Sequence, residues 1–271
     1  MPPLRILVPV KRVIDYAVKP RVNASHTAIE TSGVKHSLNP FDELSIEAAV
    51  RMREARTKKP PPPNSASTPE VADILALSAG PPKCADVLRT AMAMGADRSI
   101  LIEVGEKEEQ LEPLAVAKVL ANVVEKEGCN LVILGKQSID DDAGQTGGML
   151  AGLLGWGFAG QAAKISFTED GGGIEVAKEV DGGVETVRGR VPMVVTTDLR
   201  LNEPRYASLP NIMKAKKKEM RKVGVGGVFG WRARGGEVED GEGGGAEEEG
   251  GGGKVEDVDG LVGRLKELGA L

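Results

Sequence analysis

The chain has 271 residues, a net charge of −5, only 3% aromatic residues and only two histidines. This length suits one large domain or two small ones, and the acidic balance provides no basic field for nucleic acid. Two histidines argue against a histidine-based metal site or a Ser-His-Asp triad. The two cysteines, Cys84 and Cys129, lack metal or disulfide spacing, which favours reduced thiols in an intracellular compartment.

Strand and helix patterns alternate through the first half of the chain. Apolar runs indicate strands, and apolar residues three or four apart behind capping residues indicate helices. In chain order, the patterns predict strand 4–10, a hairpin within 18–37 turning at 23–25, helix 41–56, strand 71–77, a turn at 78–81, helix 82–94, strand 98–104, helix 111–127 and strand 131–134. This alternation predicts a doubly wound α/β fold, a mostly parallel sheet with helices on both faces.

The loop after residues 131–134 carries the clearest sign of a binding site. Three consecutive carboxylates, residues 140–142, stand between Gly135 and a Gly-rich start of a helix at 149–154. Glycines and the free N–H groups of a first helical turn form an anion site. Because carboxylates repel phosphate, they either bind Mg²⁺ or, the interpretation we favour, turn away and cap the helix. A solvated acidic turn is the remaining alternative.

Ligands of such sheets bind at the carboxyl ends of the strands. Three loops should meet there, the ones around Pro9, at residues 78–80 and at residues 135–146. We expect a nucleotide at this edge, with Thr146 adding a hydroxyl and Gln145 an amide.

The second half of the chain has a different pattern. Short strands at 162–168, 174–180 and 184–190 predict a small antiparallel extension, and one more strand is expected at 191–197. Exposed Leu and Tyr side chains in the polar stretch 198–218 suggest a docking segment, although a plain surface connection is the simpler interpretation. No apolar run is long enough to cross a membrane, so no membrane insertion is expected.

The expected domain organisation follows from composition. It comprises a nucleotide-binding domain at 1–223 with a Pro-rich loop insert at 58–69, a Gly/Glu-rich flexible linker at 224–253, and a C-terminal helix at 254–271. An amphipathic helix on a flexible tether is typical of an arm that docks on another chain.

Several long motifs resemble those of the electron-transfer flavoprotein beta subunit, a Rossmann-like, adenine-nucleotide-binding family. The resemblance covers roughly residues 4–222 and the last helix. The motifs that carry it are residues 10–15 (VKRVID), 39–41 (NPF), 135–142 (GKQSIDDD), 145–147 (QTG), 178–185 (KEVDGGVE) with Pro192, and 198–218.

The resemblance implies an electron carrier and not an enzyme. The family's beta chain pairs with an alpha subunit that holds most of the FAD, and it buries a structural AMP. The heterodimer takes electrons from acyl-CoA dehydrogenases and passes them to electron-transfer flavoprotein quinone oxidoreductase, a membrane enzyme. The implied location is the mitochondrial matrix, although the chain shows no clear cleavable presequence.

The resemblance also implies which residues form the sites. The AMP contacts would be Pro9, Asn39, Pro40, Phe41, Asp42, Ala79, Gly135, Lys136, Gln137, Ser138, Ile139, Asp140, Asp141, Asp142, Ala143, Gly144, Gln145 and Thr146. Tyr16 and Phe41 match positions near the flavin. Residues 195–217 match the partner-recognition loop, in which Leu209 is the anchor. Its neighbours in docking would be Tyr206, Pro210, Ile212 and Met213, and Lys214 and Lys217 match lysines that some members methylate.

The chain departs from the family pattern in a few places. Pro9 and Asp42 stand where small or thiol residues are usual, the insert at 58–69 is unusual, and the run 155–161 is shortened. The Gly/Glu-rich stretch 224–253 replaces a more ordered arm.

Two other functions remain open. One is a stand-alone adenine-nucleotide-binding module, which would not need residues 198–218. The other is a flavin-bifurcating relative that binds a second FAD in place of AMP, for which the acidic loop leaves little room. A dinucleotide-binding dehydrogenase is rejected, because no strand is followed by Gly-x-Gly-x-x-Gly with an acidic residue beyond it.

Overall fold

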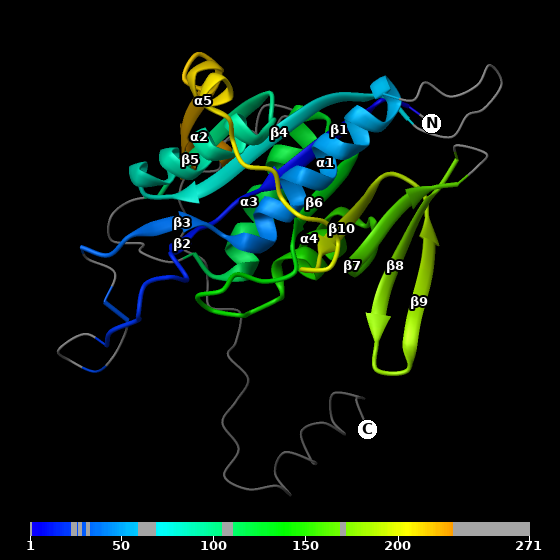
Figure 1. The fold of residues 1–271 in the computed structure, drawn as a ribbon, viewed down its shortest axis with the longest axis horizontal. Coiled ribbons are helices and arrows are strands. Elements are labelled where there is room, and N and C mark those ends of the chain that lie inside the picture. Colours follow the sequence, from blue (N-terminus) through cyan, green and yellow to red (C-terminus); the bar gives the residue numbers. More distant parts are fainter. Residues whose placement is uncertain are drawn as a thin grey trace, which may run out of the picture. The chain divides into compact units, whose positions relative to one another are not determined.

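The structure is a computed structural model that describes residues 2–22, 26, 29–30, 33–58, 69–104, 111–168 and 172–229 (Figure 1). These residues belong to the first of two compact units, Met1–Gly235 and Gly236–Leu271. The second unit lies outside the described residues. The same holds for the predicted C-terminal helix, most of the predicted linker and Pro-rich insert, and the predicted hairpin turn at 23–25.

A nine-stranded sheet forms the centre of the first unit, in the order β11-β5-β4-β1-β6-β10-β7-β8-β9. The strands that run parallel to their neighbours are β11 (Met220–Gly224), β5 (Arg98–Glu103), β4 (Val71–Gly80), β1 (Leu4–Pro9), β6 (Leu131–Gly135), β10 (Met193–Thr197) and β7 (Gly157–Phe167). At the far edge, β8 (Ile174–Val180) and β9 (Gly183–Gly189) continue from β7 as an antiparallel extension. The predicted α/β fold is confirmed.

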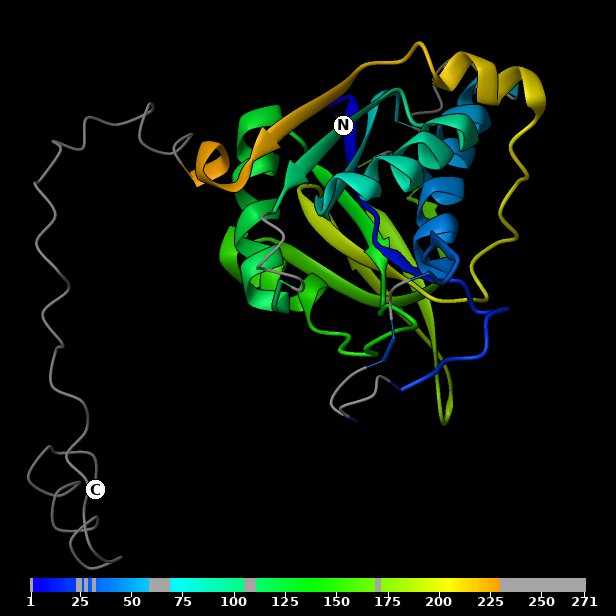
Figure 2. The same cartoon turned by 90° about the vertical axis from the view of Figure 1, so that its left-hand side faces the viewer.

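Helices cover both faces of the sheet. Buried side chains of α1 (Pro40–Lys58), α2 (Ala85–Met94) and α5 (Leu209–Ala215) share one core cluster, whereas α3 (Pro113–Glu127), α4 (Thr146–Leu154) and α6 (Val225–Phe229) belong to another. Figure 2 shows the blue and teal helices α1 and α2 on one side of the strands and the green helices α3 and α4 on the other.

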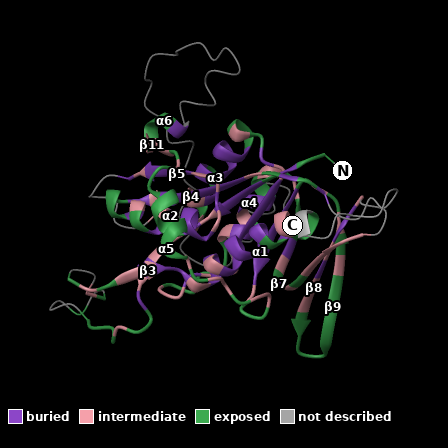
Figure 3. Ribbon diagram, turned by 45° about the horizontal axis from the view of Figure 1, so that its top comes forward, coloured by how far each residue is buried: buried purple, intermediate pink, exposed green. Residues whose placement is uncertain are grey.

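Alternation along the central strand explains the two cores. In β1, Ile6 and Val8 point into the α1 side and Leu7 into the α3 side, and all three are fully buried. Each such side chain stabilises the fold by about 2 kcal/mol through removal of apolar surface from water. Figure 3 shows this buried band along the central strands, while the β8–β9 hairpin is largely exposed.

The direction of the connections reverses between β1 and β6. From β1 the chain crosses through α1 to β4 and then through α2 to β5. From β5 it returns through α3 to β6, on the opposite side of β1. The loops that follow β1 and β6 therefore leave in opposite directions, which is the arrangement that opens a ligand crevice in a parallel sheet.

Two predicted boundaries are wrong. Residues 78–80, predicted as a turn, continue β4, because each pairs with β5 from Leu101 to Glu103. The turn is displaced to Pro81 and is followed by the 3-10 helix η1 (Pro82–Cys84). Helix α4 begins at Thr146, three residues before the predicted start.

Four further elements correct the sequence-based picture. Strand β7 begins at Gly157, so the shortened run 155–161 lies largely in a strand. Strand β11 was not predicted, and α6 occupies part of the predicted flexible linker, with Val228 buried against the α3 side. The hairpin predicted within 18–37 is present as an antiparallel bridge between Val22 and Ile29, and it extends outward to the paired strands β2 (Arg12–Ile14) and β3 (His36–Leu38).

Candidate functional site

The start of α1 holds the loop that leaves β6. Asn39 donates from Nδ2 to the carbonyl of Gln137 at 3.0 Å, and its Oδ1 accepts the N–H of Ile139 at 3.3 Å. The Asn39 carbonyl accepts the N–H groups of Asp42 and Glu43, as a residue before a helix does. One residue thus begins the helix and fixes the loop.

Asp42 ties the exits of two strands together. One carboxylate oxygen accepts the N–H of Lys11 at 2.8 Å, beyond β1, and the other accepts the N–H of Gly135 at 3.1 Å, at the end of β6. A Cβ at Gly135 would lie 2.6 Å from Asp42 Oδ1 and 2.6 Å from the Phe41 Cβ. Only glycine therefore fits at this crossing.

Lys11 pairs with two of the three carboxylates of the acidic loop. Its Nζ lies 2.9 Å from Asp140 and 2.8 Å from Asp141, and it donates to the Ser138 hydroxyl at 3.0 Å. Sequence reasoning gave Lys11 no role, although a lysine at one strand end and an acidic loop at another were a usable signal of charge pairing.

The preferred interpretation of the three aspartates is wrong in one respect. They do not cap α4, because Asp140 and Asp141 bind Lys11, and Asp142 accepts from Gln137 Nε2 at 2.8 Å. Gln145 occupies the N-cap position without a side-chain capping bond. Among the described residues, no group of three or more His, Cys, Asp or Glu could hold a metal ion.

Burial and pairing set the charges of the site. Burial raises the pKa of Asp42 to about 7, even though the N–H groups of Lys11 and Gly135 favour its charged form. Burial alone would lower the pKa of Lys11, but its bonds to Asp140 and Asp141 outweigh burial and raise it. Burial likewise opposes the charged form of Asp141, yet Lys11 and Ser138 lower its pKa.

The start of α4 has a packed side and an open side. A Cβ at Gly147 would lie 2.5 Å from the Thr196 methyl group, whereas a Cβ at Gly148 would meet no atom within 4 Å. The N–H groups of this first turn have no partner within the helix. A cavity of about 370 Å³ lies beside the loop, and its lining includes Gln137, Gly144 and Phe158.

The predicted nucleotide residues come from several elements. Asn39, Asp42 and residues 135–142 are joined by the bonds above, and Pro9 ends β1 beside them. Ala79 lies on β4 and packs against the core on the α3 side. The two residues predicted near the flavin differ in exposure: Tyr16 is 80% exposed, while Phe41 is 5% exposed with its ring 5.6 Å from Lys136 Nζ.

The predicted docking residues are all exposed. Tyr206 is 100% exposed, Leu209 79% and Met213 63%, and Ile212 and Pro210 are also exposed. Leu209 and Met213 stand one turn apart on α5, whose Ala215 is buried on the α2 side. Large apolar side chains grouped on the outer side of a short helix are typical of a protein–protein contact.

The comparisons with known proteins agree on one family. Residues 27–226 match the model of the electron transfer flavoprotein domain. The chain is 48% identical over 275 residues to the human "Electron transfer flavoprotein subunit beta", covering 100% of both chains. It is 50% identical to the "Probable electron transfer flavoprotein subunit beta" of Saccharomyces cerevisiae, covering 83% of this chain and 82% of the relative. A Bradyrhizobium diazoefficiens subunit beta is 50% identical, with 79% of each chain covered.

Asp42 should make the stability of the protein depend on pH. The folded state keeps the Asp42 proton up to about pH 7, whereas an unfolded chain loses it near 3.8. The stability from this group is complete below 3.8 and is lost as pH rises through about 7, by at most about 4 kcal/mol. Asp42→Asn does not titrate, so its free energy of unfolding in urea should fall less between about pH 5 and pH 8.

The exposed Asp142 supplies the matched control. Asp142→Asn makes the same chemical change outside α1, in the loop that follows β6, and its stability should fall with pH more steeply than that of Asp42→Asn. An equal slope for Asp42→Asn and the parent would contradict the assignment of a raised pKa to Asp42.

Proposed function

The chain belongs to the electron transfer flavoprotein family as a beta subunit, and we propose that it forms a heterodimer with an alpha subunit and acts as an electron carrier, not an enzyme. In this proposal, acyl-CoA dehydrogenases supply the electrons and electron-transfer flavoprotein quinone oxidoreductase accepts them. The proposed location is the mitochondrial matrix. None of the helices in the described ranges is both long enough and apolar enough to cross a membrane.

One observation carries the docking part of the proposal. The surface of Tyr206, Leu209 and Met213 is apolar, exposed and fixed to the body of the protein on both sides. A carrier has to dock with several proteins and leave again, so it needs a small contact with few anchoring side chains. A short helix that presents one leucine and its apolar neighbours meets that need.

We propose that the crevice between β1 and β6 holds a structural AMP. The N–H groups at the start of α4 would bind its phosphate, while Asn39 and residues 135–142 shape the loop around it. The Lys11 pairing supports this fit, because its positive charge offsets part of the repulsion that the acidic loop would exert on an anion. The nucleotide would add negative charge and packing, and no redox chemistry.

We propose further that the FAD, held mainly by the alpha subunit, supplies the redox chemistry of the heterodimer. The contribution of this chain would be to enclose the flavin and to present a docking surface. Tyr16, which is 80% exposed beyond β2, is available for such a contact.

The proposed AMP site can be tested by introducing a larger side chain at the open start of α4. Gly148→Val introduces a side chain at the open start of α4 without a clash in the chain itself, because no atom lies within 4 Å of its Cβ. If the phosphate binds there, the AMP released by acid from the purified heterodimer should fall to a small fraction of the parent value.

Gly152→Val is the matched control, one turn further along α4 and equally open. It carries the same helix penalty and should retain AMP. Full AMP content in both variants would place the phosphate elsewhere, and a second FAD in place of AMP would favour the bifurcating alternative.

Leu209 should be the anchor of the docking surface. Leu209→Ala removes most of a side chain that is 79% exposed, so we expect the KM for a reduced acyl-CoA dehydrogenase to rise roughly tenfold or more. Bound FAD and AMP should stay unchanged. Leu114→Ala removes an exposed leucine of α3, outside residues 195–217, and should leave KM near the parent value. Loss of cofactor from Leu209→Ala would overturn the docking assignment.

A further inference from the structure

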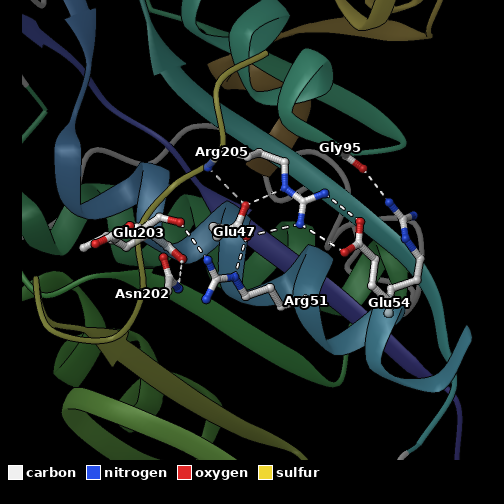
Figure 4. A network of polar contacts seen from close by, with 9 residues as sticks. Glu47, Arg51, Glu54, Gly95, Asn202, Glu203 and Arg205 are labelled. Carbon is white, nitrogen blue, oxygen red and sulfur yellow. Dashed lines mark hydrogen bonds and ion pairs between the residues drawn. The ribbon is translucent and has the colours of Figure 1, made fainter. Parts of the chain in front are cut away.

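A buried carboxylate on α1 holds the segment that leads to the docking surface. Glu47 lies in the middle of α1, and its side chain is only 3% exposed. It accepts from Arg205 Nε at 2.6 Å and from a second Arg205 nitrogen at 3.1 Å, which is a two-pronged contact. It also accepts from Arg51 Nε at 2.5 Å, on the next turn of the same helix (Figure 4).

The neighbouring residues of the segment are fixed to the same helix. Asn202 donates to the carbonyl of Leu44 at 3.0 Å, and Arg51 donates to the carbonyl of Glu203 at 2.9 Å. Arg205 also contacts Glu54 at 2.6 Å. Residues 202–205 therefore follow the surface of α1, as Figure 4 shows, although about 150 residues or more separate the partners in sequence.

The inward position of Arg205 is followed at once by an exposed aromatic side chain. Arg205 points to Glu47, and Tyr206 is 100% exposed. The other end of the docking surface is fixed to α2, because Arg89 donates to the carbonyl of Ala215 at 2.8 Å and Lys218 to that of Met92 at 3.0 Å. The exposed apolar side chains lie between these two attachments.

Glu47 stays charged in this position. Burial alone would raise its pKa, but the hydrogen bonds from Arg205 and Arg51 outweigh burial and lower it. A buried charge is tolerated only with close partners. Glutamine at position 47 would offer the two guanidinium groups one neutral oxygen in place of a carboxylate, and its NH2 group is a donor that cannot accept from them. The link between α1 and the segment then depends on weaker bonds.

We propose that Glu47 is a positioning residue for partner docking: by holding Arg205 against α1, it presents Tyr206 and Leu209 in one fixed geometry. This inference rests on the proposed docking function. A surface that is ordered before contact does not have to be ordered at the moment of binding, so more of the contact energy appears as affinity. Glu47 itself is buried and takes no part in the contact.

The test compares Glu47→Gln with the parent in the complete heterodimer. Amide hydrogen exchange of residues 199–208 should become faster, because the segment opens more often. If the docking geometry is then populated about one tenth of the time, the KM for a reduced acyl-CoA dehydrogenase rises roughly tenfold. The kcat at saturating dehydrogenase and the bound FAD should not change.

Two further variants give the comparison its controls. Arg205→Met removes the same contact from a residue nearer the surface, so it should reproduce both effects even if Glu47→Gln folds poorly. Combining the two substitutions should add little, as for partners in one contact. Glu54→Gln makes the same chemical change at the outer end of the network, and its effects should be smaller, since Glu54 is 29% exposed and Glu47 only 3%.

Unchanged hydrogen exchange in both Glu47→Gln and Arg205→Met would overturn the inference, as would a fall in kcat with unchanged KM. A raised KM for Leu209→Ala with an unchanged KM for Glu47→Gln would overturn the inference alone. An unchanged KM for Leu209→Ala would overturn the docking function itself, and the inference with it.

Discussion

The structure depends on one helix, α1, which is bound to distant parts of the chain both at its start and in its middle. Its start is bound to the exits of β1 and β6 through Asn39 and Asp42, and its middle is bound to residues 202–205 through Glu47. The helix itself is held by the core on one face of the sheet. A single helix therefore sets the positions of the loop after β6 and of residues 202–205, which are far apart in sequence.

The polar contacts of the site serve to fix the positions of its loops. Its carboxylates are paired with Lys11, Gln137 or main-chain N–H groups, and each of these contacts shapes a loop. Such an arrangement suits a bound group that has to stay in place while electrons move elsewhere. Asp42 differs from the other carboxylates because its charged form is not fully stabilised. The two N–H donors do not compensate for the burial of the charge, and the pKa of Asp42 is therefore raised.

Local sequence patterns predicted most of the fold, since apolar runs and helix caps report local structure directly. They failed where distant residues decide. Residues 78–80 look like a turn but pair with β5, and the Gly-rich stretch of α6 looks like a linker but buries Val228. The acidic-loop partners of Lys11 and the Arg205 partner of Glu47 are 127 to 158 residues away, so their contacts become definite only in the fold. The residues of the acidic loop were predicted, whereas the direction of their side chains required the fold.

The central claim is that this beta subunit works as part of a flavin-containing carrier, and the composition of its native complex tests that claim most directly. The tagged chain would be recovered from its own extract, and the visible spectrum and the acid-released nucleotides would be measured. The account predicts a yellow heterodimer with one larger subunit, one FAD and one AMP. A folded chain that carries AMP or ATP without flavin and without a partner would contradict it.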